Sequence, residues 1–181
     1  VLVHVGGRDY AHSQYDFVEL GRRPLGTALF PFIYAAAFEN GSNPASQLLD
    51  EQLNARQLMV GGMEGVVGEW GMEVREPRYE GEITARRGLN SSKISATVGM
   101  GVKLGLGKVV AMAKDFGIDI SSEKLLNRLL VGWDLVSLPE VVMAYTTFPR
   151  GGSRVAKTHY ILSIQDGNGE SRYRSDLSSL E

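Results

Sequence analysis

Few side chains in this sequence are equipped for covalent or metal chemistry. The 181 residues include no cysteine, which excludes disulfides, thiolate nucleophiles and cysteine zinc sites. The three histidines, His4, His12 and His159, are scattered, and this spacing argues against a histidine-rich metal site. No carboxylate spacing around His4 and His12 indicates a catalytic dyad, so we interpret both as ordinary polar or core residues. We therefore expect neither a metal ion nor a cofactor.

Thr27 is the hydroxyl whose place in the sequence most invites a chemical role. It opens an apolar stretch, 27–40, that we expect to form a buried helix ending at Asn40 and Gly41. Threonine at such a start is a typical N-cap. A nucleophilic hydroxyl needs a base within reach, and one turn later the chain has Phe30. The N-cap interpretation is favoured, with a nucleophile as its alternative.

Two other patterns have simpler explanations than a binding site. Gly99, Gly101, Gly105 and Gly107 suggest a nucleotide loop, but their spacing differs from the dinucleotide fingerprint and the preceding segment is helical in pattern. We interpret them as small residues in helix packing. The acidic residues Glu19, Asp50 and Glu51 are interpreted as solvated surface charges.

The elements expected to position these residues are mainly helical. Residues 1–5 predict a strand, 42–82 an irregular region with short strand-like pieces at best, and 83–117 two helices with a break near Gly105–Gly107. A short helix over 122–131 and another over 138–148, with Pro139 at its start, are expected next. Residues 158–165 predict a strand that turns at 166–169 into a hairpin. The pattern indicates an α+β chain.

The amino-acid composition limits the classes of binding partner that we expect. Hydrophobic residues make up 43% and charged residues 22% of the chain, which is typical of a globular domain. The formal net charge is −2, so no field of one sign favours nucleic acid. No run of 18 apolar residues is present, so we expect membrane contact only through segments outside this chain.

Short blocks of sequence carry a family resemblance through nearly the whole chain. They include Gly-Gly-Arg-Asp-Tyr at 6–10 and Arg-Arg-Pro-Leu-Gly-Thr at 22–27, with further blocks at 13–17, 28–34, 78–84, 88–94, 114–118, 137–148 and 161–169. In this order they resemble the transpeptidase domain of class A penicillin-binding proteins. That family carries three motifs: Ser-x-x-Lys, Ser-x-Asn and Lys-Thr-Gly. The serine forms an acyl-enzyme, and the lysine one turn later accepts its proton.

The first motif departs from the family. It reads Thr27-Ala-Leu-Phe30, so a β-branched hydroxyl replaces the serine and a phenyl ring replaces the base. Loss of a general base typically removes about 10²–10⁴ in rate.

The second and third motifs depart as well. The second aligns with Ser92-Lys93-Ile94, in which isoleucine replaces the asparagine that would bind the substrate amide. The third is expected after the 161–169 hairpin, beyond residue 181; Lys157-Thr158-His159 imitates it in the wrong place and is interpreted as chance. Loss of the lysine and the asparagine together indicates loss of acyl transfer with the fold retained.

The resemblance implies a partial penicillin-binding-protein or β-lactamase-like transpeptidase fold, an antiparallel sheet flanked by helices, with residues 1–181 as one incomplete domain. It implies that Thr27, Phe30, Ser92 and Ile94 cluster, and that Trp70 and Tyr79 border the cleft as substrate-binding candidates or core anchors. The implied partners are a peptidoglycan stem peptide or cell-wall synthesis proteins, with weak, non-covalent β-lactam binding. The implied location is extracytoplasmic.

Three functions remain open on this basis. The first is a catalytically degenerate transpeptidase domain with a binding or scaffold role. The second is an active D,D-transpeptidase or hydrolase that uses Thr27 with an unusual base. The third is a structural or regulatory interaction domain whose cleft is closed by Phe30 and Ile94.

Overall fold

A computed structural model describes residues 5–53, 78–120, 126–155 and 161–175. Several expectations fall outside these residues: most of the strand over 1–5, Trp70, His4, the Lys157-Thr158-His159 imitation and the start of the helix over 122–131.

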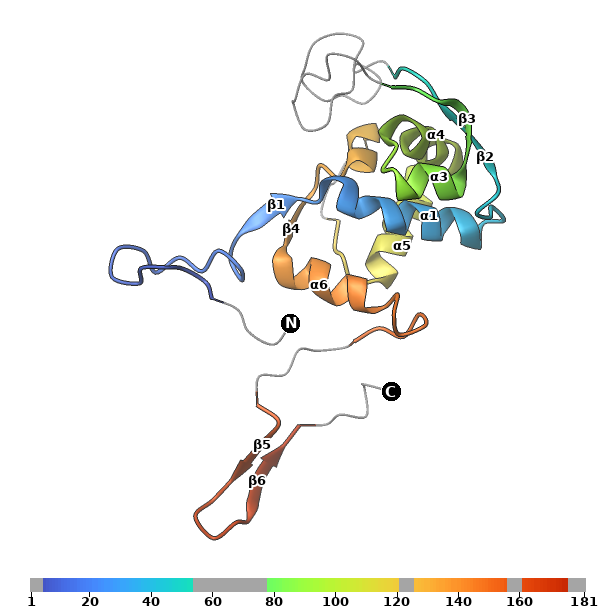
Figure 1. Cartoon of the computed structure of the whole chain (residues 1–181). Helices are drawn as coiled ribbons and strands as arrows, with labels where there is room; N and C mark the ends of the chain where they lie inside the picture. Colours follow the sequence, from blue (N-terminus) through green and yellow to red (C-terminus); the bar gives the residue numbers. More distant parts are fainter. Residues whose placement is uncertain (1–4, 54–77, 121–125, 156–160, 176–181) are drawn as a thin grey trace.

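The helices form the body of the molecule (Figure 1). A 3₁₀ turn η1 (Gly26–Leu29) leads into α1 (Phe30–Glu39), and α3 (Ala85–Asn90), α4 (Ile94–Leu104) and α5 (Leu106–Asp115) follow after the two strands described next. A second 3₁₀ turn, η3 (Asn127–Val131), and α6 (Leu138–Thr146) complete the helices among the described residues. The helix expected over 138–148 and the break at Gly105 are confirmed. Of the helix expected over 27–40, only Phe30–Glu39 is α-helical, and residues 26–29 form the 3₁₀ turn.

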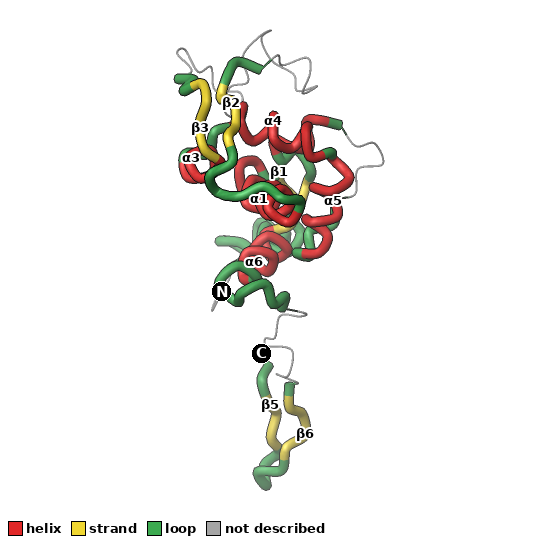
Figure 2. Tube along the Cα trace, turned by 90° about the vertical axis from the view of Figure 1, so that its right-hand side faces the viewer, coloured by secondary structure: helices red, strands yellow, loops and turns green. Residues whose placement is uncertain are grey.

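Three antiparallel strand pairs accompany the helices. β1 (Arg22–Pro24) pairs with β4 (Leu135–Ser137), and β2 (Gln47–Asp50) pairs with β3 (Gly81–Thr84). The hairpin β5 (Ser163–Gln165) and β6 (Ser171–Arg174) turns where the sequence predicts, with the Asp166 amide donating to the Glu170 carbonyl. Figures 1 and 2 show this hairpin apart from the helical body. The observed architecture is α+β, as expected.

α1 is the central helix because its apolar side chains point in all directions. Phe30, Phe32, Ile33, Tyr34, Ala36 and Ala37 are all buried. Pro31 stands at the start of the helix, where a missing amide hydrogen costs least, and the Asn40 side chain donates to the Ala36 carbonyl at its end. Figure 2 shows α1 surrounded by other elements. This helix therefore organises the core.

An aromatic cluster joins α1 to α5 and α6. Phe32 makes edge-to-face contacts with Phe116 and Tyr145, with ring centroids 4.9 and 5.3 Å apart. Phe148 lies 5.0 Å from Phe116. Such pairs contribute about 0.5–1.5 kcal/mol each beyond their buried area. The cluster holds α1 in a fixed relation to α6 and to the end of α5.

One expectation about local structure is wrong. Residues 83–117 form three helices rather than two, because the chain also breaks between Asn90 and Ile94. The region 42–82, expected to be irregular with short strand-like pieces at best, contains β2 and the start of β3, which pair with one another. Strands of four residues offer too little alternation to stand out in sequence.

No single helix in the described part of the chain is long and apolar enough to cross a membrane. α4 and α5 together meet the length and composition requirement, but they bend by 100° at their junction, and both contribute buried residues to the core. Gly105, with φ +97°, makes that bend.

Candidate functional site

Thr27 lies in a tightly fixed turn ahead of α1. The Gly26 amide donates to the Gly132 carbonyl at 3.0 Å, and a Cβ on Gly132 would overlap the backbone of Gly26. The Tyr145 hydroxyl donates to the Ala28 carbonyl at 2.8 Å. The turn is thus held from η3 on one side and α6 on the other.

The N-cap interpretation of Thr27 is wrong. Thr27 is inside η1, whose preceding residue is Leu25, and neither η1 nor α1 has a side-chain cap. The Thr27 side chain is half-buried. The physical reason is that the chain enters through a 3₁₀ turn set by Gly26, whose φ is +61°, so α-helical geometry begins only at Phe30.

Phe30, which the family resemblance aligns with the motif lysine, has its side chain in the core. It is 1% exposed and clusters with Leu29, Ile33 and Leu130 among other apolar residues. A phenyl ring has no lone pair that could accept a proton, and it carries no charge that could assist the transfer of a proton. Both the side chain of residue 30 and its surroundings are therefore apolar.

Ser92 and Ile94 lie at the junction of α3 and α4. Ser92 is exposed in the turn between the helices, and Ile94 is the first residue of α4. Ile94 packs against the same apolar cluster that contains Phe30. The second motif thus contributes one exposed hydroxyl and one partly buried apolar side chain.

A buried hydrogen bond links the helices that carry the two motifs. The hydroxyls of Tyr34 in α1 and Thr97 in α4 are 3.2 Å apart. Tyr34 follows Phe30 by about one turn, and Thr97 follows Ile94 by about one turn. This crossing supports the expected cluster of Thr27, Phe30, Ser92 and Ile94, which stays a prediction.

Lys93, between Ser92 and Ile94, is bound to acidic groups. Its ammonium lies 2.8 Å from Asp50 Oδ2 and 2.9 Å from Glu80 Oε1, and it donates to the Arg78 carbonyl at 2.8 Å. Partial burial alone would lower the pKa of Lys93, but the hydrogen bonds to Asp50 and Glu80 outweigh it and raise that pKa. Lys93 therefore stays protonated and is no substitute for the lost base.

Glu80 is the carboxylate that this network perturbs most. Hydrogen bonds from Arg87 and then from Lys93 lower the pKa of Glu80 to about 2. Arg87 contributes two of them, each at 3.0 Å. Because the folded-state pKa lies below the ordinary value of 4.5, the ionised network contributes stability above pH 4.5, and that contribution is lost as pH falls toward 2.

We expect Arg87→Gln to raise the pKa of Glu80 toward its ordinary value, because the largest cause of the shift is removed. The side-chain carboxyl of Glu80, followed by NMR through an acid titration, measures this directly. Arg86→Gln is the matched control, since Arg86 is the exposed neighbour on the same helix. A Glu80 midpoint near 4.5 in the unaltered chain would contradict the network.

This network is the part of the site that sequence reasoning missed. Asp50, expected to be a solvated charge, is buried and paired with Lys93, which is a correction. No local pattern reports a contact between residues so far apart in sequence. Tyr79 is half-buried next to this network, and burial first and then the charge of Asp50 raise its pKa. Its substrate-binding role stays a prediction, as does that of Trp70.

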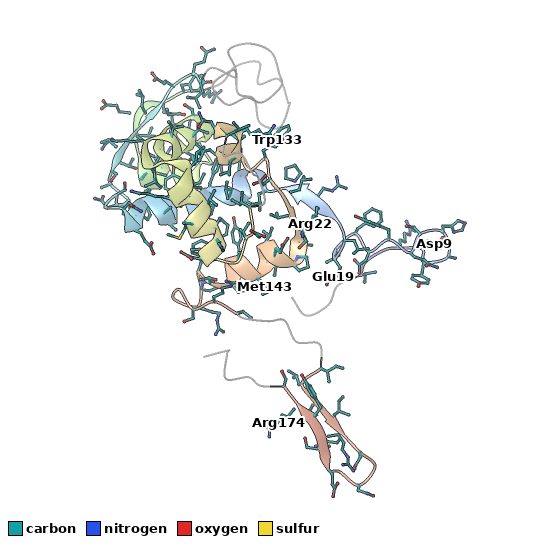
Figure 3. All side chains as sticks on the ribbon, turned by 180° about the vertical axis from the view of Figure 1, so that it is seen from behind. Asp9, Glu19, Arg22, Trp133, Met143 and Arg174 are labelled. Atoms are coloured by element: carbon teal, nitrogen blue, oxygen red, sulfur yellow. The ribbon has the colours of Figure 1, made fainter. Side chains whose placement is uncertain are left out.

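Trp133 is a further exposed feature beside the Thr27 turn. It follows Gly132 directly, its side chain is exposed, and the Arg128 guanidinium lies 5.9 Å from its ring centre (Figure 3).

His12 is exposed and hydrogen-bonds Asp9. Within the described ranges, no three His, Asp or Glu side chains gather as ligands of a metal would.

Sequence comparison gives one consistent result. The chain is 34% identical to penicillin-binding protein 1A of Rickettsia conorii over 176 residues, which is 97% of this chain and 21% of that protein. It is 28% identical to penicillin-binding protein 1A of Neisseria meningitidis over 176 residues, which is again 97% of this chain and 21% of that protein. The chain thus spans about a fifth of the length of these curated relatives. No protein-family model matches it.

Comparison with solved structures agrees with the sequence comparison. The crystal structure of penicillin-binding protein 1A from Haemophilus influenzae matches with a TM-score of 0.78 at 26% identity, covering 95% of this chain and 25% of that one. Penicillin-binding protein A from Mycobacterium tuberculosis, as its imipenem acyl-enzyme complex, shares the fold with a TM-score of 0.69 at 18% identity, covering 85% of this chain and 38% of that one. The fold is therefore penicillin-binding-protein-like, and the chain is homologous to a segment of penicillin-binding protein 1A.

Proposed function

We propose that this chain is a penicillin-binding-protein-like transpeptidase domain of bacterial peptidoglycan synthesis that has lost acyl transfer and retains a binding or scaffold role. Homology to penicillin-binding protein 1A supports the domain type. The single observation that carries the loss of chemistry is Phe30, which stands at the position of the proton acceptor with its side chain 1% exposed.

The energies of the missing and remaining catalytic contributions argue against an active enzyme that uses Thr27. The missing general base is worth about 10²–10⁴ in rate, or ~3–5 kcal/mol. A helix N-terminus favours negative charge by about 0.3–1 kcal/mol, which is too little to replace it. Lys93 points to Asp50 and Glu80 and is held protonated by them. The Thr27 hydroxyl therefore remains a weak nucleophile.

A specific observation favours a closed interaction domain as the second candidate. Phe30 and Ile94, which replace the lysine and the asparagine, pack in one apolar cluster. If both positions line the family's cleft, apolar atoms there would fill the space for substrate and offer no partner for an amide. A closed cleft would leave the outer surface of the domain to bind other proteins.

The partners follow from the domain type. We propose a peptidoglycan stem peptide or cell-wall synthesis proteins as partners, an extracytoplasmic location, and weak, non-covalent association with β-lactams. Penicillin-binding protein A from Mycobacterium tuberculosis forms acyl-enzyme complexes with imipenem and penicillin G, and the departures at Thr27 and Phe30 argue against such a bond here.

The test is a cross-linking assay combined with a binding assay on the same protein. We expect no cross-linked product from a stem-peptide substrate and, if the cleft is open, co-sedimentation with purified peptidoglycan. Absence of both would favour the closed interaction domain. Cross-linked product that disappears in Thr27→Val, which keeps the shape without the hydroxyl, would contradict the loss of activity.

A further inference from the structure

Trp133 is presented at the surface by a turn that is anchored in the core. η3 places Leu129 and Leu130 in the apolar cluster, and Leu130 fills the space that a Cβ on Gly101 of α4 would need. Gly132 ends η3 with φ +69°, a left-handed conformation that glycine adopts at little cost. Trp133 follows and is 44% exposed. A firmly packed turn therefore holds this large aromatic ring at the surface.

The Arg128 guanidinium lies over the ring of Trp133. It is 5.9 Å from the ring centre, which is within the range of a cation–π contact. Among the residues that the structure describes, Arg128 has no ion-pair partner and no side-chain hydrogen bond. A guanidinium carries five N–H donors in a planar fork that matches the two oxygens of a carboxylate. Arg128 therefore keeps these donors for a group that binds from outside.

Asp134 is the acidic side chain whose charge interacts with Arg128, but it makes no direct contact with the guanidinium. Its Oδ2 is buried without a hydrogen-bond partner. Burial raises the pKa of Asp134, and the charge of Arg128 only partly opposes this. Asp134 is therefore a poor counter-charge, and it leaves the donors of Arg128 unoccupied.

The pair of Trp133 and Arg128 adjoins the Thr27 turn. The Gly26 amide donates to the Gly132 carbonyl at 3.0 Å, so Trp133 comes one residue after a direct contact with the residue that precedes Thr27. An extended peptide advances about 3.3 Å per residue. A peptide bound at the Thr27 turn thus has the ring of Trp133 within a few residues of its own chain.

We propose that Trp133 and Arg128 form a binding site for a short peptide with a free α-carboxylate, which packs on the indole ring and accepts two hydrogen bonds from the guanidinium. The inference rests on the proposed function, and it names the stem peptide as the part of peptidoglycan that this domain binds. An uncharged glycan strand would also stack on an exposed tryptophan, but it has no use for the positive charge of Arg128.

The test is ¹⁹F NMR of the full-length protein labelled with 5-fluorotryptophan, in which the Trp133 signal is identified by its loss from Trp133→Phe. The probe is diacetyl-Lys-D-Ala-D-Ala, and we expect its free acid to shift this signal to saturation. The C-terminal amide of the same peptide should bind about tenfold more weakly, because it lacks the charge-assisted hydrogen bonds. Arg128→Gln should weaken binding of the free acid by a similar factor. Arg86→Gln, a change at another exposed arginine, is the matched control and should leave it unaltered.

Three results would overturn the proposal. They are a Trp133 signal that the peptide does not move, equal binding of acid and amide, and a shift by an uncharged N-acetylglucosamine oligomer that Arg128→Gln leaves intact. Failure here is distinct from failure of the proposed function. Cross-linked product would contradict the loss of acyl transfer and leave this site standing, whereas co-sedimentation with peptidoglycan while the Trp133 signal stays in place would overturn this site alone.

Discussion

Replacing Phe30 by lysine should lower the free energy of unfolding by about 3–5 kcal/mol, although it restores the residue that the family has at this position. The side chain of residue 30 is 1% exposed and clusters with apolar residues including Leu130 and Ile94. An ammonium placed there loses its hydration and finds no carboxylate or amide to replace it. Urea denaturation measures the change.

Glu39→Lys is the matched control for this experiment. Glu39 ends the same helix and is exposed, so the same new residue should change stability by no more than about 0.5 kcal/mol. A Phe30→Lys variant as stable as the unaltered chain would show that residue 30 faces a polar cleft. In that case, the loss of reactivity would follow from the replaced side chains rather than from a closed cleft.

The second large effect concerns reactivity. The triple variant Thr27→Ser, Phe30→Lys, Ile94→Asn should react with a penicillin about 10²–10⁴ times faster than the unaltered chain, because it regains the general base and the amide together. It should also recover part of the stability that Phe30→Lys alone loses, since the new amide would pair with the ammonium. Effects of neighbours in one network are coupled in this way.

The design is made in the full-length protein, so that a third motif outside these 181 residues can contribute if the protein has one. Thr27→Ser alone is the control, and it should remain as unreactive as the starting chain, since a serine without a base gains little. A triple variant that folds and stays inert would attribute the loss of reactivity to a closed cleft. The interaction-domain alternative would then be favoured.

Helix ends with strong local signals were predictable from sequence. α6 begins where Pro139 indicates, and its start is held by a capping box in which the Ser137 amide donates to the Glu140 carboxylate at 2.7 Å. The end of α1 at Asn40 and the hairpin turn after Gln165 follow from the same short-range chemistry.

Features that depend on contacts between distant residues were not predictable. Thr27 was expected to cap α1, but the Gly26–Gly132 contact imposes a 3₁₀ turn there. Asp50 was expected to be solvated, but Lys93 pairs with it across the fold. Strands β1 and β4 have three residues each and exist through their pairing with one another. In each case a tertiary contact overrides the local pattern.

The candidate site was predictable from sequence only in part. The motif positions came from resemblance, and the structure places Phe30 and Ile94 in one apolar cluster, as the closed-cleft hypothesis requires. Ser92 is exposed in the turn that ends α3, where its φ is +49°. The ion pairs of Lys93 with Asp50 and Glu80 became visible only in the structure.

The central claim is that this domain has lost acyl transfer, and intact-mass analysis after incubation with a penicillin tests it most directly. A protein with Phe30 in place of the base should keep its unmodified mass at ordinary penicillin concentrations. A mass increase of one penicillin, mapped to Thr27, would contradict the account and establish an active acyl-transfer site.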